Sequence, residues 1–154
     1  MAISPNAFSN VIDCDIHPTV PSLDALLPYM NEHWKDTIVQ RGVHELETIS
    51  YPKNAPLTVR PDWRLEKGVP ASNVDLIKKQ ALDPFGTSIA VLNCLYGVQL
   101  LMSEDMASSF ASAVNDWIKA EFLDKEPRLR ASIVIPTQSP VSYTHLTLPT
   151  TVIV

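Results

Sequence analysis

Three side chains that can bind a metal ion occur at alternate positions near the start of the chain. They are Asp13, Asp15 and His17, within the segment VIDCDIHP at residues 11–18. Because side chains alternate along a strand, the three would share one face, and the apolar residues between them would share the other. Two carboxylates and an imidazole on one face are costly to bury unless a partner such as a divalent cation compensates them.

The spacing leaves two interpretations of this segment open. Carboxylate oxygen and imidazole nitrogen together suit zinc, with manganese or iron as alternatives. A D-x-H pair is a short motif, however, and the same residues also serve as caps of the following loop, where Asp13 would accept hydrogen bonds from backbone amides. Metal ligation and loop capping are therefore both compatible with the residues alone.

The elements around this segment predict an α/β fold. Strands alternate with helices along the chain, which favours a parallel sheet with right-handed crossovers. The expected order is a strand at 11–18, a helix from Ser22 to Gly42 broken near Pro28, a long insert at 43–71, a short helix opened by Ser72–Asp75, a strand at 88–95 covered on both faces, a helix capped by Ser103, and a strand at 131–136.

Polar and aromatic residues near the later elements are weaker candidates. Asn93 and Tyr96 follow the second strand, where the rim of a parallel barrel would face a substrate, although a loop hydrogen bond is the preferred explanation. Arg60, Trp63 and Arg64 in the insert would either contact an anionic or aromatic substrate or fasten the loop.

Further residues receive structural interpretations. Trp34 and Trp117 lie on apolar helical stripes and are expected in the core. Arg128 is expected to be a solvated charge. Cys14 and Cys94 each lie in an apolar run, which favours buried thiols and a reducing compartment.

Composition narrows the possible partners. The chain has 154 residues and a formal net charge of -5 without a basic cluster, so it is the length of one domain and a nucleic-acid partner is not expected. The first residues lack the pattern of a signal peptide, and no run has the length of a transmembrane helix. We therefore expect a cytoplasmic protein that acts on a small molecule and does not bind a membrane.

Four segments in the expected order resemble the amidohydrolase-related family of metal-dependent hydrolases and decarboxylases. The segments are VIDCDIHP with LLPYMNEHWKD (11–18 and 26–36), RPDWR (60–64), ALDPFGTSIAVLN (81–93) and NDWIKAEFLDKEPRLRASIVIPTQSP (115–140). The resemblance implies a (β/α)₈ TIM barrel, of which residues 1–140 would form the first three strands and their helices. It also implies a hydrolase or a non-oxidative decarboxylase acting on a small carbonyl or carboxylate compound.

In that family the first strand supplies an H-x-H metal pair, and the matching positions here are Asp15 and His17. The first histidine is thus replaced by aspartate, a harder oxygen donor that is still a workable ligand. The remaining ligands and the acid/base residues come from later strands. We therefore expect the present chain to be an inactive N-terminal fragment. We also expect that the intact enzyme can assemble as a homo-oligomer.

The last 14 residues, 141–154, follow none of the preceding patterns. Residues 141–150 (VSYTHLTLPT) match the translation of an adapter used in DNA library preparation, so we expect a non-native tail; the alternative is an edge strand. Such barrels need about 250 residues, so a partial barrel with open sheet edges is expected to aggregate. The alternative for the whole chain is a metal-free α/β binding or interaction module in which Asp15 and His17 are structural caps.

Overall fold

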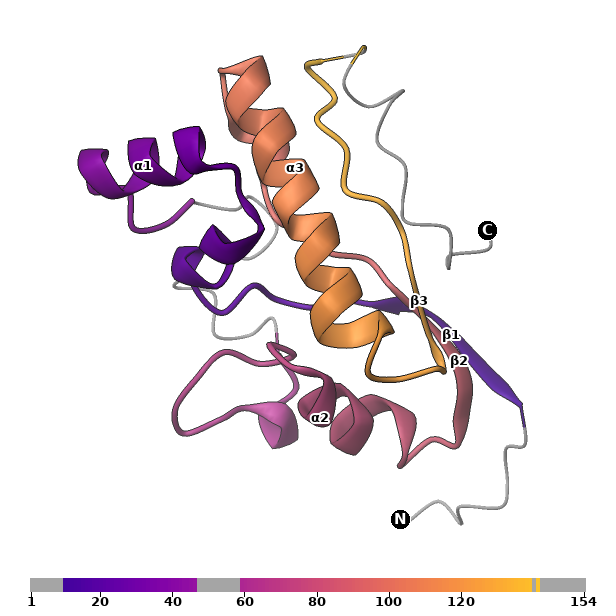
Figure 1. The fold of residues 1–154 in the computed structure, drawn as a ribbon. Coiled ribbons are helices and arrows are strands. Elements are labelled where there is room, and N and C mark those ends of the chain that lie inside the picture. Colours follow the sequence, from indigo (N-terminus) through magenta and orange to yellow (C-terminus); the bar gives the residue numbers. More distant parts are fainter. Residues whose placement is uncertain (1–9, 47–58, 140, 142–154) are drawn as a thin grey trace.

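The computed structural model describes residues 10–46, 59–139 and 141. Three strands and three α-helices alternate along this part of the chain (Figure 1), with short 3-10 and π-helical turns between them. In chain order the main elements are β1 (Val11–Ile16), α1 (Glu32–Arg41), α2 (Val74–Ile77), β2 (Thr87–Leu92), α3 (Glu104–Ile118) and β3 (Leu129–Ala131).

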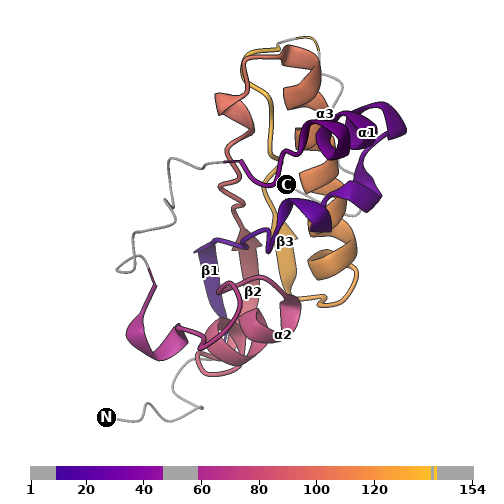
Figure 2. The same ribbon diagram turned by 90° about the vertical axis from the view of Figure 1, so that its left-hand side faces the viewer.

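The strands form one parallel sheet in the order β1-β2-β3, and Figure 2 shows them side by side. The expected α/β class is therefore confirmed. A sequential parallel order begins both a (β/α)₈ barrel and one half of a doubly wound sheet, so three strands are compatible with either architecture. The strand predicted at 131–136 is displaced, because β3 consists of Leu129–Ala131 and ends where 131–136 begins.

The helices of the described residues cover one face of the sheet. Figure 1 shows α1, α2 and α3 on the same side, and the residues facing them on β2 and β3 are buried: Ala90, Leu92, Leu129 and Ala131. On β1 and β2 the paired residues Ile12 and Ile89 are 59% and 37% exposed. The prediction that the second strand is covered on both faces is therefore wrong for the described residues.

The alternation predicted for β1 is interrupted by its register. Asp13 pairs with Ala90 and Ile16 with Leu92, so three steps along β1 match two along β2. A bulge of this kind turns side chains away from strict alternation. Asp15 and His17 still approach each other, and Cys14, predicted to be buried, is exposed, as is Ile12 two residues before it.

The segment after β1 is helical in separate pieces, as Pro28 predicts. Two 3-10 turns, at Leu23–Ala25 and Leu27–Tyr29, precede α1. The side chain of Ser22 makes no capping hydrogen bond; instead Asn31 caps α1 by accepting from the Trp34 amide. Gly42 ends α1 in the left-handed conformation with φ 61°, where glycine avoids the Cβ strain.

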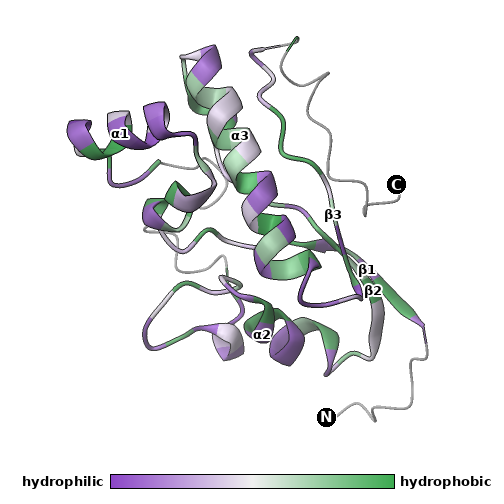
Figure 3. Ribbon diagram, viewed as in Figure 1, coloured by the Kyte–Doolittle hydropathy of each residue, from purple (hydrophilic) through white to green (hydrophobic). Residues whose placement is uncertain are grey.

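Helix α3 is the longest helix of the described residues. Ser103 caps it as predicted, accepting from the Met106 amide, and a π-helical turn at Lys119–Leu123 follows it. Figure 3 shows hydrophobic and hydrophilic segments mixed along α3, and the hydrophobic residues Phe110 and Trp117 are buried. Trp34 lies on the largely hydrophilic α1 and is only half-buried, so the prediction that it belongs to the core is wrong.

The structure describes the insert at 43–46 and 59–71, whereas 47–58 lie outside the described residues. Of the expected tail at 141–154, only Val141 is described. Ala71 accepts a hydrogen bond from the Thr19 amide at 3.1 Å, which joins the end of the insert to the loop after β1. The short helix α2 begins one residue later than the expected capping box, because Asn73 accepts from the Leu76 amide. Within the described residues, no helix has the length and apolarity needed to cross a membrane.

Candidate metal and substrate site

Asp15 and His17 come together at the carboxyl end of β1. The Nε2 atom of His17 lies 3.4 Å from Oδ1 of Asp15. The Asp15 side chain is 70% exposed and that of His17 is 29% exposed, so both are accessible from solvent. The backbone amide of Asp15 donates to Oδ1 of Asp13 at 3.0 Å, which confirms a local capping role for Asp13.

The hydrogen bond of the other His17 nitrogen determines which tautomer is present. Nδ1 lies 2.8 Å from the backbone carbonyl oxygen of Asn93. A carbonyl oxygen only accepts, so Nδ1 carries a proton and donates. In the neutral imidazole the lone pair is then on Nε2, the atom beside Asp15. Metal-binding histidines are commonly oriented in this way, by a carbonyl that accepts from the second ring nitrogen.

Asn93 joins the end of β2 to the end of β1 through its backbone carbonyl, its backbone amide and its side-chain amide. Its backbone amide donates to the carbonyl of Ile16 at 2.7 Å, continuing the ladder beyond the strands. Its side-chain Nδ2 donates to the carbonyl of Cys14 and to Oδ1 of Asp15, each at 3.0 Å. The residue predicted to face a substrate thus contacts both candidate ligands, and it also makes the loop hydrogen bonds of the alternative interpretation.

The donor pair fits part of a tetrahedral metal site. Two ligands about 2.1 Å from a zinc ion at the tetrahedral angle stand about 3.4 Å apart. The observed separation of Nε2 and Oδ1 is 3.4 Å. Complete sites need three or four ligands, and residues 10–46, 59–139 and 141 contain no group of three or more His, Cys, Asp or Glu side chains suited to hold a metal. Asp15 and His17 therefore form half of a possible ligand set.

Tyr96 is placed differently from the other candidates. Its ring stacks on Phe110 with centroids 6.4 Å apart, and it packs against the hydrophobic core. Among the described residues its buried hydroxyl has no hydrogen-bond partner, and burial raises its pKa well above the ordinary value. The described contacts of Tyr96 are thus with the core rather than with Asp15 and His17.

Side-chain contacts of Arg60, Arg64 and Gln80 fasten the described part of the insert. Arg60 forms two hydrogen bonds to Asp62, at 3.0 and 2.7 Å, and lies over the ring of Trp63 at 4.9 Å. Gln80 donates to the carbonyl of Trp63 at 3.2 Å, and Arg64 to that of Val59 at 3.3 Å. Of the two interpretations given for these residues, the contacts match the one in which the arginines and Trp63 fasten the loop.

Two residues have roles that sequence reasoning missed. Arg128, expected to be a solvated charge, pairs with Glu126 and Asp83 through side-chain hydrogen bonds of 2.9 to 3.0 Å. Ser132, which directly follows β3, donates its hydroxyl to Oδ1 of Asn93 at 2.8 Å. The signal for Ser132 was its place after a strand, which became visible only once the end of β3 was known.

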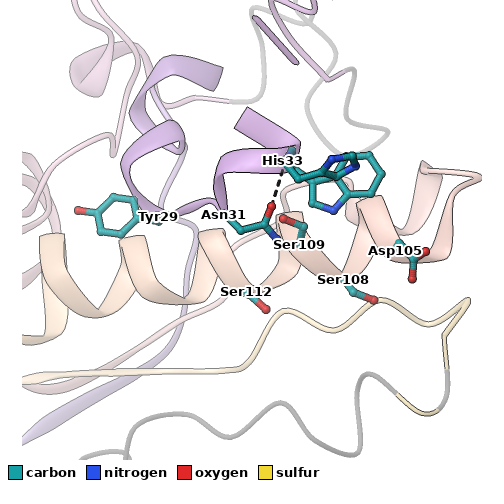
Figure 4. A pocket seen from close by; sticks show the side chains of 8 residues that line it. Tyr29, Asn31, His33, Asp105, Ser108, Ser109 and Ser112 are labelled. Atoms are coloured by element: carbon teal, nitrogen blue, oxygen red, sulfur yellow. Dashed lines mark hydrogen bonds between the residues drawn. The ribbon is translucent and has the colours of Figure 1, made fainter. Parts of the chain in front are cut away.

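A separate groove lies between α1 and α3 (Figure 4). The segment leading into α1 contributes Tyr29 and Asn31, and α1 contributes His33 and Trp34, whose rings meet edge to face at 5.1 Å. Helix α3 contributes the rest of the lining, which is mostly serine: Asp105, Ser108, Ser109 and Ser112. The groove shares no lining residue with the Asp15–His17 pair.

Comparisons with known proteins leave the family open. No protein-family model matches the chain, and no curated protein matches it. The fold and the geometry at the ends of the strands therefore carry the functional argument.

Proposed function

We propose that this chain is the N-terminal part of a metal-dependent amidohydrolase-related enzyme, in which Asp15 and His17 supply the first two metal ligands. The enzyme would be a hydrolase or a non-oxidative decarboxylase of a small carbonyl or carboxylate compound, acting in the cytoplasm. The three described strands would be the first of a (β/α)₈ barrel, whose site lies at the carboxyl ends of its strands. The chain by itself would be inactive, because the other ligands would come from later strands.

The observation that carries the proposal is the 3.4 Å approach of Nε2 of His17 to Oδ1 of Asp15. With Nδ1 donating to the Asn93 carbonyl, a neutral imidazole brings a lone pair toward a carboxylate oxygen. Two acceptors this close repel each other unless a cation lies beside them or a proton lies between them. A divalent metal, with zinc first and manganese or iron as alternatives, meets this requirement and matches the donor types.

The chain's own residues would divide the work at the site. Asp15 and His17 would hold the metal, which polarises a carbonyl and lowers the pKa of a bound water. The Asn93 carbonyl keeps the imidazole in the tautomer with Nε2 available for coordination, and the Asn93 amide holds the Asp15 carboxylate by a hydrogen bond. Asn93 thereby keeps both ligands in place before the metal binds, which favours a defined coordination geometry.

The second candidate is a metal-free α/β binding or interaction module. It is favoured by the hydrogen bonds that tie the end of β1 to the end of β2 through His17 and Asn93, and by the local bond from the Asp15 amide to Asp13. These bonds would stabilise the strand ends without a metal. In that case Nε2 of His17 would carry a proton, and His17 and Asp15 would form an ordinary exposed ion pair. Such pairs contribute about 0–1 kcal/mol, which makes a purely structural role a small one.

Equilibrium dialysis against Zn²⁺ followed by elemental analysis tests the two candidates. We expect the wild-type chain to retain up to one Zn²⁺ per chain and an Asp15→Ala/His17→Ala double variant to retain none. A His33→Ala/Asp36→Ala double variant on α1 is the matched control, because it removes the same side-chain types from an exposed helix. Equal zinc in the wild type and the Asp15/His17 variant contradicts the metal function.

A further inference from the structure

We propose that Ser132 is a positioning residue of the site, whose hydroxyl orients the Asn93 amide so that the amide holds Asp15 beside His17. This inference rests on the proposed metal function but concerns a different strand. Ser132 directly follows β3, so it brings the third strand into a cluster otherwise formed at the ends of β1 and β2.

The orientation of the Asn93 amide follows from the chemistry of its neighbours. On one side lie the carbonyl of Cys14 and the carboxylate of Asp15, which accept hydrogen bonds. On the other side lies the hydroxyl of Ser132, which can donate. Turning the amide by 180° would set its oxygen against two acceptors, so Nδ2 must face Asp15 and Oδ1 must face Ser132.

The single hydroxyl proton of Ser132 has one preferred acceptor. Oγ lies 2.8 Å from Oδ1 of Asn93 and 3.3 Å from the carbonyl of Leu92. The Leu92 carbonyl already accepts from the Ser132 backbone amide at 2.9 Å. The shorter contact to Asn93 is therefore the hydrogen bond, and the Leu92–Ser132 backbone bond places the hydroxyl for it.

The hydrogen bonds form one continuous path across the three strand ends. Ser132 donates to Asn93, Asn93 donates to Asp15, and Asp15 lies beside Nε2 of His17. Without the Ser132 hydroxyl, Oδ1 of Asn93 loses its hydrogen-bond donor. The amide can then rotate more easily, so Asp15 is held less firmly. Loss of such a supporting hydrogen bond typically lowers metal affinity by about 10-fold to 100-fold.

Titration of the chain with Co²⁺, followed by its visible absorption, tests the effect on the ligands. We expect Ser132→Ala to weaken Co²⁺ binding about tenfold, at the low end of that range because the contact is exposed, and to alter the d–d bands. Ser132→Thr keeps the hydroxyl and should restore both. Ser88→Ala is the matched control, because its hydroxyl bonds the Val11 carbonyl at 2.9 Å at the opposite end of β2, and it should leave both unchanged.

The side-chain amide resonances of Asn93 test the positioning without any metal. Ser132→Ala should shift the Asn93 resonances while leaving those of Asn115, which is bonded to the Val134 carbonyl at 2.9 Å, in place. Unchanged Asn93 resonances overturn the inference, as does unchanged Co²⁺ affinity in Ser132→Ala. If the wild type binds no Co²⁺ but the Asn93 resonances respond, the positioning by Ser132 is supported and the proposed metal function alone is overturned.

Discussion

The two ends of the same small sheet carry polar clusters built in opposite ways. At the amino end, Arg128 joins Glu126 and Asp83, and the Glu126 side chain is only 7% exposed. At the carboxyl end, Asp15 is 70% exposed and approaches His17 at 3.4 Å. The first cluster neutralises a buried carboxylate inside the fold, whereas the second displays its carboxylate to solvent.

This difference separates a structural polar cluster from a candidate site. Arg128 bonds both oxygens of Glu126 and also reaches the turn before β2, so the cluster fastens the starts of β2 and β3 together. At the carboxyl end, Asn93 donates to one oxygen of Asp15, and Ser132 in turn donates to Asn93. A buried cluster whose carboxylate is fully paired contributes to folding. An exposed cluster whose donor groups are held in place suits ligand binding.

The largest expected effect is on stability at the amino end. Arg128→Met leaves Glu126 buried without its partner, which should lower the free energy of unfolding by about 3 kcal/mol. Urea denaturation followed by circular dichroism measures the loss. In the control, Arg60→Met removes an ion pair whose side chains are both more than half exposed. That change should cost only about 0–1 kcal/mol. Equal losses in the two variants would remove the distinction.

Acid should act on the same cluster. The hydrogen bonds from Arg128 hold the pKa of Glu126 below its ordinary value of 4.5. A carboxyl group whose pKa is lowered by folding adds stability above the ordinary value, and this is lost as the pH falls through the folded-state pKa. We therefore expect the urea concentration at the midpoint of unfolding to decrease once the pH is lowered below about 4.5. Glu126→Gln should weaken that dependence; an identical acid limb in the variant would exclude Glu126 as its source.

Substitutions at the carboxyl end should change stability much less. The Asp15→Ala/His17→Ala double variant removes an exposed pair and should alter the free energy of unfolding by less than about 1 kcal/mol. The same urea titration measures it. A loss as large as that of Arg128→Met would contradict the contrast between the two ends of the sheet, because it would make Asp15 and His17 essential to the fold.

The smallest expected effect concerns the two thiols that flank the site. Cys14 is exposed, whereas burial raises the pKa of Cys94 to about 11. Since the thiolate is the reactive form, a disulfide reagent at pH 8 should label one thiol per native chain quickly and the second slowly. Cys14→Ser should abolish the fast phase. Rapid labelling of both thiols would show that the cover over Cys94 opens readily.

How far the sequence could predict this molecule depends on the range of the interactions involved. The strand–helix alternation and the Ser103 cap are local patterns, and both predicted the structure. Burial of Cys14 was predicted from its apolar run, but Cys14 is exposed, as is Ile12 two residues before it. Arg128 was misjudged because its partner Asp83 is 45 residues away and because the burial of its near neighbour Glu126 depends on tertiary packing. Local pattern does not contain such contacts.

The candidate site shows the same division. Asp15 and His17 are two residues apart, so a strand pattern could bring them together. The contact of Asn93 with Asp15 spans 78 residues, and its contact with Ser132 spans 39. Asn93 was predicted only from its place after a strand, while Ser132 required the true end of β3. Tyr96 was equally well placed in the sequence, yet its ring turned to the core.

Paramagnetic broadening by Mn²⁺ tests most directly whether the carboxyl end is the cation site. In nitrogen–proton spectra of the chain with substoichiometric Mn²⁺, we predict that the backbone amides of Asp15, His17 and Asn93 broaden first. Those of Asp83 and Glu126 should stay sharp, because Arg128 already neutralises these carboxylates. Broadening that begins at Asp83 and Glu126, or that spreads evenly over the exposed acidic residues, would contradict the assignment of the site to the carboxyl end of the sheet.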